Sequence, residues 1–267
     1  MNTHISAHEF GTTLPASRRS ALVQLVLERG QATVLELAER FQVSPDTIRR
    51  DLDHLSRRGL LSRTHGGAVV AEPLVGADAP FTSRLKVNHA AKVRIARAAA
   101  LLIASGETLI VNGGSTTLAF ARELGAISGL TVVTNNLSVP AALPHAAVHD
   151  IYLLGGQVRM ESQVTLGPVA FAGTGIIHAD TAVIGIGGVS AAGLSTTLLA
   201  EASMIAAMID ASRRVIVLAD ASKFDHNAFA HIVPLGPRQT LVSDQPPPPA
   251  LAQALSDASV DVIVADA

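Results

Sequence analysis

The sequence predicts an α/β protein in which a small N-terminal winged helix-turn-helix domain precedes a larger α/β domain with a mostly parallel sheet. Residues 33–68 combine a helix cap, a tight break, a second cap and a glycine-rich turn, which together indicate short helices and a wing. Beyond residue 105, short β-branched runs alternate with helix-like segments, as expected for buried parallel strands joined by helical crossovers. We expect the first domain at 17–72, a linker at 73–87 and the second domain at 88–267.

The composition describes a well-packed globular protein. The 267 residues are 48% hydrophobic and 16% charged, and the chain has no cysteine, so it forms no disulfide and no thiolate metal site. No apolar run reaches the roughly 18 residues that a membrane span requires, and residues 1–20 lack the apolar core of a signal peptide. We therefore expect a cytoplasmic protein without a membrane partner.

The net charge of −2 is unevenly distributed. Residues 1–70 carry nine arginines against seven acidic residues, whereas the remainder carries eleven basic and fifteen acidic residues. The segment from Ser44 to Arg58 alone contains four arginines. A modest local excess of this kind suits nucleic-acid binding that depends on a few placed contacts and weakens with salt.

The first domain is predicted to contain three helices. Residues 18–29 form the first of them. Thr33 and Glu36 have the spacing of a capping box, which begins a second helix whose apolar residues recur at helical spacing. Ser44 and Pro45 are typical of the start of a third helix. The residues of this third helix that face inward are Ile48, Leu52 and Leu55.

The third helix carries basic and hydroxyl residues in its first two turns, where a recognition helix meets the major groove. Arginine presents a planar fork that can grip a phosphate or bind the guanine edge. Residues 60–70 predict two short strands around a glycine turn, a wing that can touch DNA backbone or minor groove. A small helical bundle with solvated arginines is the alternative. The candidate DNA contacts are Thr33, Ser44, Thr47, Arg49, Arg50, Arg63 and His65.

The second domain alternates predicted strands and helices. The strands are expected at 108–111, 130–134, 151–154, 182–186, 215–219, 240–242 and 260–264. The helices are expected from residue 88 up to Gly106, and at 116–125, 138–143, 198–211 and 250–258. In open sheets of this kind, ligands bind beyond the carboxyl ends of the strands.

One strand end has the chemistry of a phosphate-binding loop. The strand at 108–111 runs into Asn112-Gly113-Gly114-Ser115-Thr116-Thr117, and a helix follows directly. Glycines let backbone amides approach an anion, hydroxyls add donors, and a helix N-terminus adds partial positive charge. The chain has no Walker motif, and residues 185–188 are not a full dinucleotide fingerprint. A plain glycine turn is the alternative.

Other strand ends add polar groups at the same edge. Lys223 could pair with a phosphate or a sugar hydroxyl, and Glu201 could accept hydroxyl hydrogen bonds. Each has a simpler alternative: Asn135 as a helix cap, the paired glycines as turns, Lys223 as a solvated side chain, and Glu201 as a partner of the helix dipole. The full set of candidate ligand contacts is Asn112, Gly113, Gly114, Ser115, Thr116, Thr117, Thr134, Asn135, Gly155, Gly156, Gly187, Glu201, Asp220 and Lys223.

The motifs resemble those of the DeoR family of bacterial transcriptional regulators. The N-terminal pattern VS-x-x-TIRRDL, L-x-x-x-G-L and R-x-HGGA is matched at Val43-Ser44, Thr47 to Leu52, Leu55 to Leu60, and Arg63 to Ala68. The pattern of the family's sensor domain is matched at Asn112 to Thr117, Thr134-Asn135, Gly155-Gly156, Gly185 to Gly188, Glu201, Asp220 and Ser222-Lys223-Phe224.

The resemblance spans residues 17–245. It implies a sensor domain similar to ribose-5-phosphate isomerase and a phosphorylated sugar or sugar derivative as effector. The family loop most often begins with Asp, whereas this chain has Asn112, which is neutral and can donate as well as accept.

These features predict a DNA-binding transcriptional regulator, a repressor of a carbohydrate-metabolism operon whose effector shifts it between two states. Paired half-sites imply a homodimer or homotetramer. One alternative is a sugar-phosphate isomerase-like enzyme carrying a DNA-binding domain. Isomerisation needs a placed carboxylate base, and Asn112 removes an acidic group from the loop. Another alternative is a pure oligomerisation scaffold. We expect no catalysis and no cofactor. We also expect no metal site, because His145 and His149 lie in a polar stretch beside Pro144.

Overall fold

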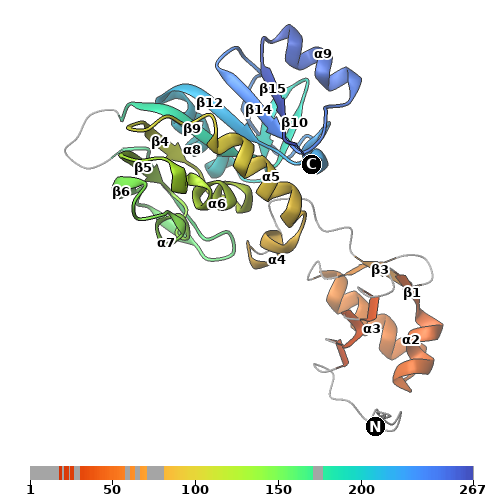
Figure 1. The fold of residues 1–267 in the computed structure, drawn as a ribbon. Coiled ribbons are helices and arrows are strands. Elements are labelled where there is room, and N and C mark those ends of the chain that lie inside the picture. Colours follow the sequence, from red (N-terminus) through yellow and green to blue (C-terminus); the bar gives the residue numbers. More distant parts are fainter. Residues whose placement is uncertain are drawn as a thin grey trace, which may run out of the picture. The chain divides into compact units, whose positions relative to one another are not determined.

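The computed structural model describes residues 18–19, 21–23, 25–26, 31–57, 61–63, 67–70, 81–170 and 177–266; residues 31, 56–57, 61–63 and 68–70 are described by their backbone alone. The chain divides into two compact units, Met1–Leu74 and Val75–Ala267. Each unit is considered by itself (Figure 1).

The first unit combines short helices with a small antiparallel sheet of order β1-β3-β2. The described residues between 18 and 26 are helical. The other elements are β1 (Gln31–Thr33), α2 (Val34–Phe41), α3 (Pro45–Arg57), β2 (Leu61–Arg63) and β3 (Gly67–Val70). The two predicted wing strands correspond to β2 and β3. The sequence analysis missed β1, whose three residues pair with β3 and give the wing a third strand.

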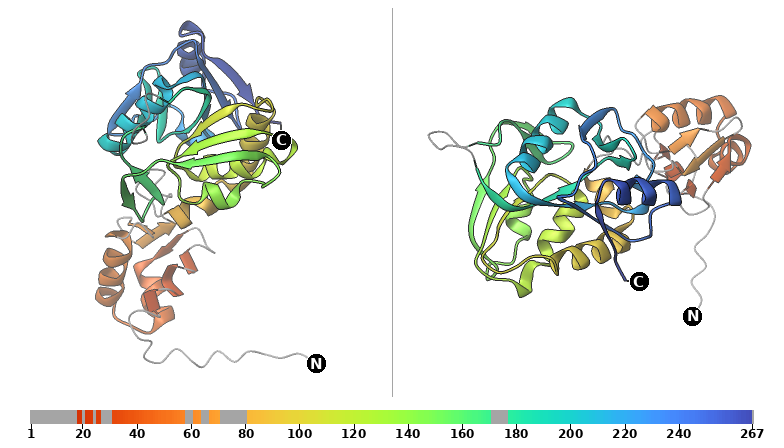
Figure 2. Two further views of the ribbon diagram at one scale, coloured as in Figure 1. Left: turned by 90° about the vertical axis from the view of Figure 1, so that its left-hand side faces the viewer. Right: turned by 90° about the horizontal axis from the view of Figure 1, so that it is seen from above.

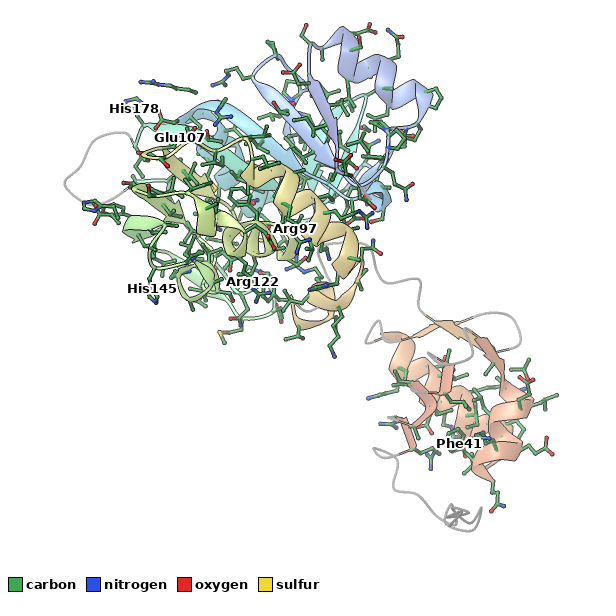
Figure 3. The ribbon with its side chains drawn as sticks, in the orientation of Figure 1. Phe41, Arg97, Glu107, Arg122, His145 and His178 are labelled. Carbon is green, nitrogen blue, oxygen red and sulfur yellow. The ribbon has the colours of Figure 1, made fainter. Side chains whose placement is uncertain are left out.

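The core of the first unit is formed by the predicted apolar faces. Leu22, Leu37, Ile48 and Leu52 are fully buried, and Phe41 lies among the packed side chains (Figure 3). Gln42 at the turn has a φ of 53°, and its N–H bonds to carbonyls at the end of α2. This left-handed residue stops α2 and lets the chain reverse into α3.

The second unit contains a seven-stranded parallel sheet of order β15-β14-β12-β9-β4-β5-β6. Its strands are β4 (Thr108–Val111), β5 (Leu130–Thr134), β6 (Val148–Leu153), β9 (Ala179–Gly185), β12 (Ser212–Leu218), β14 (Gln239–Ser243) and β15 (Asp261–Val264). The helices are α4 (Phe81–Lys86), α5 (His89–Ala100), α6 (Ser115–Arg122), α7 (Val139–Ala142), α8 (Leu199–Asp210) and α9 (Pro249–Asp257), with short 3-10 turns at Leu124–Ala126 and Ala221–Lys223.

Helices cover both faces of this sheet, with α5 and α6 on one face and α8 on the other (Figure 2). Successive strand residues therefore enter different cores. Ile110 of β4 packs with Met204 and Met208 of α8, whereas Leu109 packs with Ile95 of α5. Burial on both faces explains why the strands are continuous apolar runs instead of alternating ones.

The amino-terminal edge of the sheet is closed by an ion pair. Arg214 of β12 donates to the Glu107 carboxylate at 2.8 and 3.0 Å. Thr181 of β9 donates to the same carboxylate at 2.7 Å. Glu107 and His178 both lie at this edge (Figure 3), opposite the carboxyl ends of the strands.

Two small sheets were not predicted. One has the order β10-β11-β13 and the other is the β7–β8 hairpin. Their strands are β7 (Gln157–Arg159), β8 (Val164–Leu166), β10 (Gly188–Ser190), β11 (Gly193–Thr196) and β13 (Ala230–Val233). All are only three or four residues long, which is too short for a clear periodic signal.

The segment 73–87, which was predicted as a linker, contains α4 at residues 81–86. Phe81 is 4% exposed and packs in the same core as Ile95 of α5. Burial of this aromatic ring stabilises α4 against the second unit.

Candidate functional site

The first turns of α3 present hydroxyl and arginine side chains. Ser44 Oγ accepts a hydrogen bond from the Thr47 N–H at 3.2 Å and lies 2.9 Å from Thr47 Oγ1, so Ser44 caps the helix. Arg49 pairs with Asp46 at 2.5 Å, and both side chains are more than half exposed. Arg50 is also exposed. This surface has the residue types that a recognition helix brings into the major groove.

The inner side of α3 is fixed by a buried ion cluster. Asp51 is 2% exposed and accepts from Arg18 Nε at 2.6 Å and from Arg19 Nε at 2.7 Å. A carboxylate this deeply buried persists only because charged partners satisfy it. The cluster ties the residues before β1 to α3 and so fixes the direction in which Arg49 and Arg50 project.

The remaining predicted DNA contacts are described only in part. The Thr33 N–H and hydroxyl donate to the Glu36 carboxylate at 2.7 and 2.8 Å, in the predicted capping box. Arg63 lies in β2 and is described by its backbone alone, and His65 lies outside the described residues.

In the second unit, Asn112 joins the ends of two neighbouring strands. It follows β4, and Gly185 ends β9 beside it. Asn112 Nδ2 donates to the Gly185 carbonyl at 2.8 Å, and Asn112 Oδ1 accepts from the Gly185 N–H at 2.8 Å. Asn112 is 1% exposed. Its amide therefore continues the backbone ladder beyond the last paired residues and sets the position of the loop that follows.

The glycine loop, residues 112–117, is shaped by inward hydrogen bonds. Thr117 is fully buried, and its Oγ1 lies 2.8 Å from the Asn112 carbonyl oxygen and 3.1 Å from that of Gly114. Gly114 precedes α6 in an extended conformation. The first amides of α6, from Ser115 and Thr116 onward, have no carbonyl partner within the helix. They give the loop the donors and the partial positive charge of an anion site.

Residues after β5 brace this loop. Thr134 Oγ1 donates to the Val111 carbonyl at 2.7 Å and accepts from the Asn136 N–H at 3.0 Å. Asn136 Nδ2 donates to the Gly114 carbonyl at 3.3 Å. Asn136 was not among the candidate ligand contacts, because its bracing role depends on the adjacency of β4 and β5.

Asn135 places a buried acceptor beside the glycine loop. It is 4% exposed, and its Nδ2 donates to the Thr165 carbonyl at 2.8 Å. Its Oδ1 has no hydrogen-bond partner among the described residues. A Cβ placed on Gly113 would lie 3.7 Å from this oxygen. Buried acceptors of this kind are rare in folded proteins and need a water or a ligand as partner.

The β7–β8 hairpin packs over the same loop. Gly155 and Gly156 precede β7, and the φ of Gly156 is +137°; a Cβ there would meet the Leu166 carbonyl oxygen at 2.1 Å. In β8, Val164 is so close to Gly113 that a Cβ on that glycine would lie 2.1 Å from Val164 Cγ1. The predicted glycine pair at 155–156 therefore serves the turn into the hairpin.

A second polar cluster lies beyond β12. Asp220 is 3% exposed, and its Oδ1 accepts from Asn88 Nδ2 and from the Ser222 N–H, both at 3.1 Å. Lys92 of α5 is buried, and its Nζ donates to the carbonyls of Arg84 and Val87 at 2.6 Å. These contacts join the α4–α5 turn to the end of β12.

Two lysines in this cluster have perturbed pKa values. Burial lowers the pKa of Lys92 to about 8, although the Asp220 carboxylate opposes the change; the positive charges of Lys223 and Arg84 add to it. Burial also lowers the pKa of Lys223, with Asp220 again opposing and Arg84 adding. Burial therefore disfavours the protonated lysines here, and an anion bound next to them would favour their charged form again.

Glu201 and Gly187 form a third group. Glu201, in the first turn of α8, accepts from Thr196 Oγ1 at 2.7 Å. The Gly187 N–H donates to the Ser195 carbonyl at 2.8 Å. Both residues are thus connected to β11, at the same edge of the sheet.

The structure therefore divides the predicted ligand contacts into three groups. The glycine loop meets Thr134 and Asn135 directly, whereas Asp220 and Lys223 lie with the α4–α5 turn, and Glu201 and Gly187 lie near β11. The sequence analysis did not single out Asn88 and Lys92 of the second group. The sequence around Lys92 gave no signal, because the burial of this lysine depends on α4.

Two family descriptions match the chain: "DeoR-like helix-turn-helix domain" over residues 18–73 and "DeoR C terminal sensor domain" over residues 87–245. The chain belongs to the DeoR family. Its predicted family resemblance is confirmed, and so is the predicted architecture of an N-terminal helix-turn-helix domain and an α/β sensor domain.

Curated relatives of this DeoR-family chain are named as transcriptional regulators. The glycerol-3-phosphate regulon repressor of Escherichia coli (strain K12) is 33% identical over 90% of this chain and 95% of its own length. The HTH-type transcriptional repressor GlcR of Bacillus subtilis (strain 168) is 30% identical over 93% and 96%. The L-fucose operon activator of Haemophilus influenzae is 31% identical over 85% and 91%.

Among solved structures, a D-ribose-5-phosphate isomerase in complex with phospho-erythronic acid aligns with 49% of this chain and 52% of its own, at 24% identity and a TM-score of 0.35. A likeness of this size supports no conclusion about activity. The relatives above identify the chain as a DNA-binding transcriptional regulator and not an enzyme. Within the described ranges, no helix is long and apolar enough to cross a membrane, and no three His, Asp or Glu side chains group as metal ligands.

Proposed function

We propose that this DeoR-family regulator represses a carbohydrate-metabolism operon by inserting α3 into the major groove of operator DNA. The observation that carries the proposal is the two-sided character of α3: exposed Arg49 and Arg50 on one side, and Asp51 held by Arg18 and Arg19 on the other. Base contacts are assigned to Thr47, Arg49 and Arg50, and phosphate contacts to Ser44 and Arg63, with Thr33 and His65 at the margin of the interface.

One helix-turn-helix module contacts few base pairs, and regulators of this type bind paired half-sites as symmetric oligomers. The protein therefore acts in the cytoplasm as a homodimer or homotetramer. Its partners are operator DNA and a small effector, without a membrane partner.

The effector is a phosphorylated sugar or sugar derivative bound at the carboxyl edge of the sheet. The phosphate is assigned to the glycine loop, where amides and hydroxyls converge at the start of α6. Glu201 and Asp220 supply acceptors for hydroxyl groups, and Lys223 supplies a cation. The names of the relatives support this class, since they refer to a glycerol-3-phosphate regulon and an L-fucose operon.

The effector signal leaves the site through the α4–α5 turn. Asp220 and Lys92 hold this turn by the hydrogen bonds to Asn88, Arg84 and Val87. A ligand that changes the charge balance around Asp220 acts on the first helix after the linker. It shifts DNA binding only to the extent that it binds the two states with different affinity.

The test starts with operator selection from a random double-stranded library by the full-length protein. Binding of the selected DNA is then measured by fluorescence anisotropy with and without a panel of sugar phosphates and their unphosphorylated parents. The proposal expects one phosphorylated compound to change the DNA affinity while its parent does not. An equal change in DNA affinity with a sugar phosphate and with its parent contradicts a phosphorylated effector. So does the absence of any change with every sugar phosphate.

A further inference from the structure

The β7–β8 hairpin carries an arginine toward the glycine loop. Arg159 pairs directly with Val164 across the antiparallel hairpin. Directly opposed residues of such a pair project from the same face. Because Val164 contacts Gly113 from that face, the Arg159 side chain starts on the side of the hairpin that meets the glycine loop.

This hairpin is firmly attached to its surroundings. The Thr165 N–H donates to the Asn135 carbonyl at 2.9 Å, and the Leu137 N–H donates to the Gln163 carbonyl at 3.0 Å. Asn136 and Val164 also form an antiparallel bridge. These contacts anchor β8 and the turn residue Gln163, and the pairing of β7 with β8 then fixes the position of the Arg159 backbone.

The hairpin and the end of β5 each contribute a buried polar atom without a partner among the described residues. Arg159 Nε and Asn135 Oδ1 are buried, and neither has a hydrogen-bond partner in the described part of the chain. One is a charged donor and the other a neutral acceptor. Together they match a ligand that offers an anionic oxygen next to a hydroxyl group.

The present ion pair of Arg159 is weak. Its Nη2 lies 3.5 Å from Glu161 Oε2, and the Glu161 side chain is 81% exposed. An exposed pair at this distance contributes little stability. Exchange of this carboxylate for a buried oxyanion therefore costs the protein little.

Lys223 is less well placed for this role. The charged groups that act on it are Asp220 and Arg84, and neither belongs to the glycine loop. Within the described residues, no hydrogen bond joins the cluster around Asp220 to the loop. Arg159, by contrast, is paired across the hairpin with Val164, the residue that contacts Gly113 of the loop.

We propose that Arg159 is an effector-binding residue: its guanidinium and the first amides of α6 hold the same oxyanion, while Asn135 Oδ1 accepts a hydroxyl hydrogen bond from the same molecule. The inference rests on the proposed function, and it narrows the ligand to one whose anionic group and hydroxyl group are neighbours. A planar fork also selects a tetrahedral oxyanion more strongly than a lysine does.

The test uses inorganic phosphate as the probe, titrated into the full-length protein against sodium chloride of equal ionic strength, with the melting temperature as readout. Phosphate also stabilises proteins non-specifically, so variants decide the result. Arg159→Gln removes the cation, and Arg159→Lys keeps the charge without the fork. Arg213→Gln is the matched control, because Arg213 is 86% exposed in β12 near the opposite edge of the sheet.

Wild type and Arg213→Gln are expected to gain stability at low phosphate. Arg159→Gln should need a roughly tenfold higher phosphate concentration for the same stabilisation, as expected for the loss of a charge-assisted hydrogen bond. Arg159→Lys should need an intermediate concentration. Equal stabilisation of all four proteins overturns the assignment of Arg159. A sugar phosphate that stabilises wild type and Arg159→Gln equally also overturns it, yet leaves the proposed function intact. Phosphate binding that requires Arg159, without a response to any sugar phosphate, would uphold the oxyanion site and refute the phosphosugar effector.

Discussion

Asn112 and Gly185 exchange two hydrogen bonds of 2.8 Å, one donated by the side-chain amide and one accepted by it. The pair joins the ends of β4 and β9 at the point where the glycine loop begins. An amide can both donate and accept in this geometry, whereas an ionised aspartate can only accept. The neutral residue that distinguishes this loop from the usual family pattern therefore has a structural role, and its direct contact with an effector stays a prediction.

Asn112→Asp should destabilise the second unit. The carboxylate would face the Gly185 carbonyl with no donor to offer, at a position that is 1% exposed. The expected loss is roughly 3 kcal/mol at neutral pH. Burial should raise the pKa of the new carboxyl. The difference in the free energy of unfolding between wild type and the variant should therefore be smallest near pH 4 and grow as pH rises. Urea unfolding across this range checks the prediction, and a gap that does not change with pH contradicts it.

Gly113→Ala should loosen the hairpin from the glycine loop. The added Cβ would lie 2.1 Å from Val164 Cγ1, which forces the hairpin to shift. The expected cost is about 1 to 3 kcal/mol, together with weaker phosphate binding. Val164→Ala removes the clashing methyl group, so the double variant should lose less stability than the two single variants summed. Strict additivity would show that the two residues are not in contact.

Stability should rise with pH because of Lys92. Its pKa is 10.5 when unfolded and about 8 when folded, owing to burial. The unfolded chain therefore binds more protons between these values, and the free energy of unfolding increases as pH rises from 8 to 10.5. The increase should be on the order of 3 kcal/mol. Chemical unfolding of Lys92→Met, compared with wild type at each pH, should show a flatter profile; parallel profiles would rule out the buried charge.

Arg50→Ala should weaken operator binding by about 1 to 3 kcal/mol without changing the response of the sensor unit. Arg50 is exposed on α3, whereas its neighbour Asp51 is buried. Arg40→Ala is the matched control, because Arg40 is exposed in the last turn of α2. Anisotropy with selected operator DNA measures the first effect, and ligand-induced thermal stabilisation measures the second. Loss of both in Arg50→Ala would contradict the division of labour between the two units.

Much of the fold was predictable because it is encoded locally. The strands at 108–111 and 130–134 were predicted with their observed bounds, since each is an apolar run ended by turn residues. The position of the ligand loops followed from parallel topology, which brings all carboxyl ends to one edge. The helix-turn-helix was predicted from the residues that cap the start of its two helices.

The missing parts depend on tertiary contacts. The β7–β8 hairpin has three-residue strands, and its place is set by Val164 against Gly113 and by the Thr165–Asn135 hydrogen bond. The helix α4 depends on the burial of Phe81, and no periodic pattern in the sequence indicates this burial. Lys223 was predicted only to lie at the same sheet edge as the glycine loop, and its grouping there with Asp220 and Lys92 could not be predicted without the tertiary contacts.

The central claim is that a phosphorylated sugar binds the glycine loop of this regulator. The most direct measurement is the melting temperature of the full-length protein against a panel of sugar phosphates and their unphosphorylated parents, since a ligand that binds only the folded state must raise it. We predict that one phosphorylated compound stabilises wild type, that its parent does not, and that Gly114→Asp abolishes the effect by placing a carboxylate at the phosphate position. Stabilisation that survives in Gly114→Asp, or its absence with every phosphorylated compound, would contradict the account.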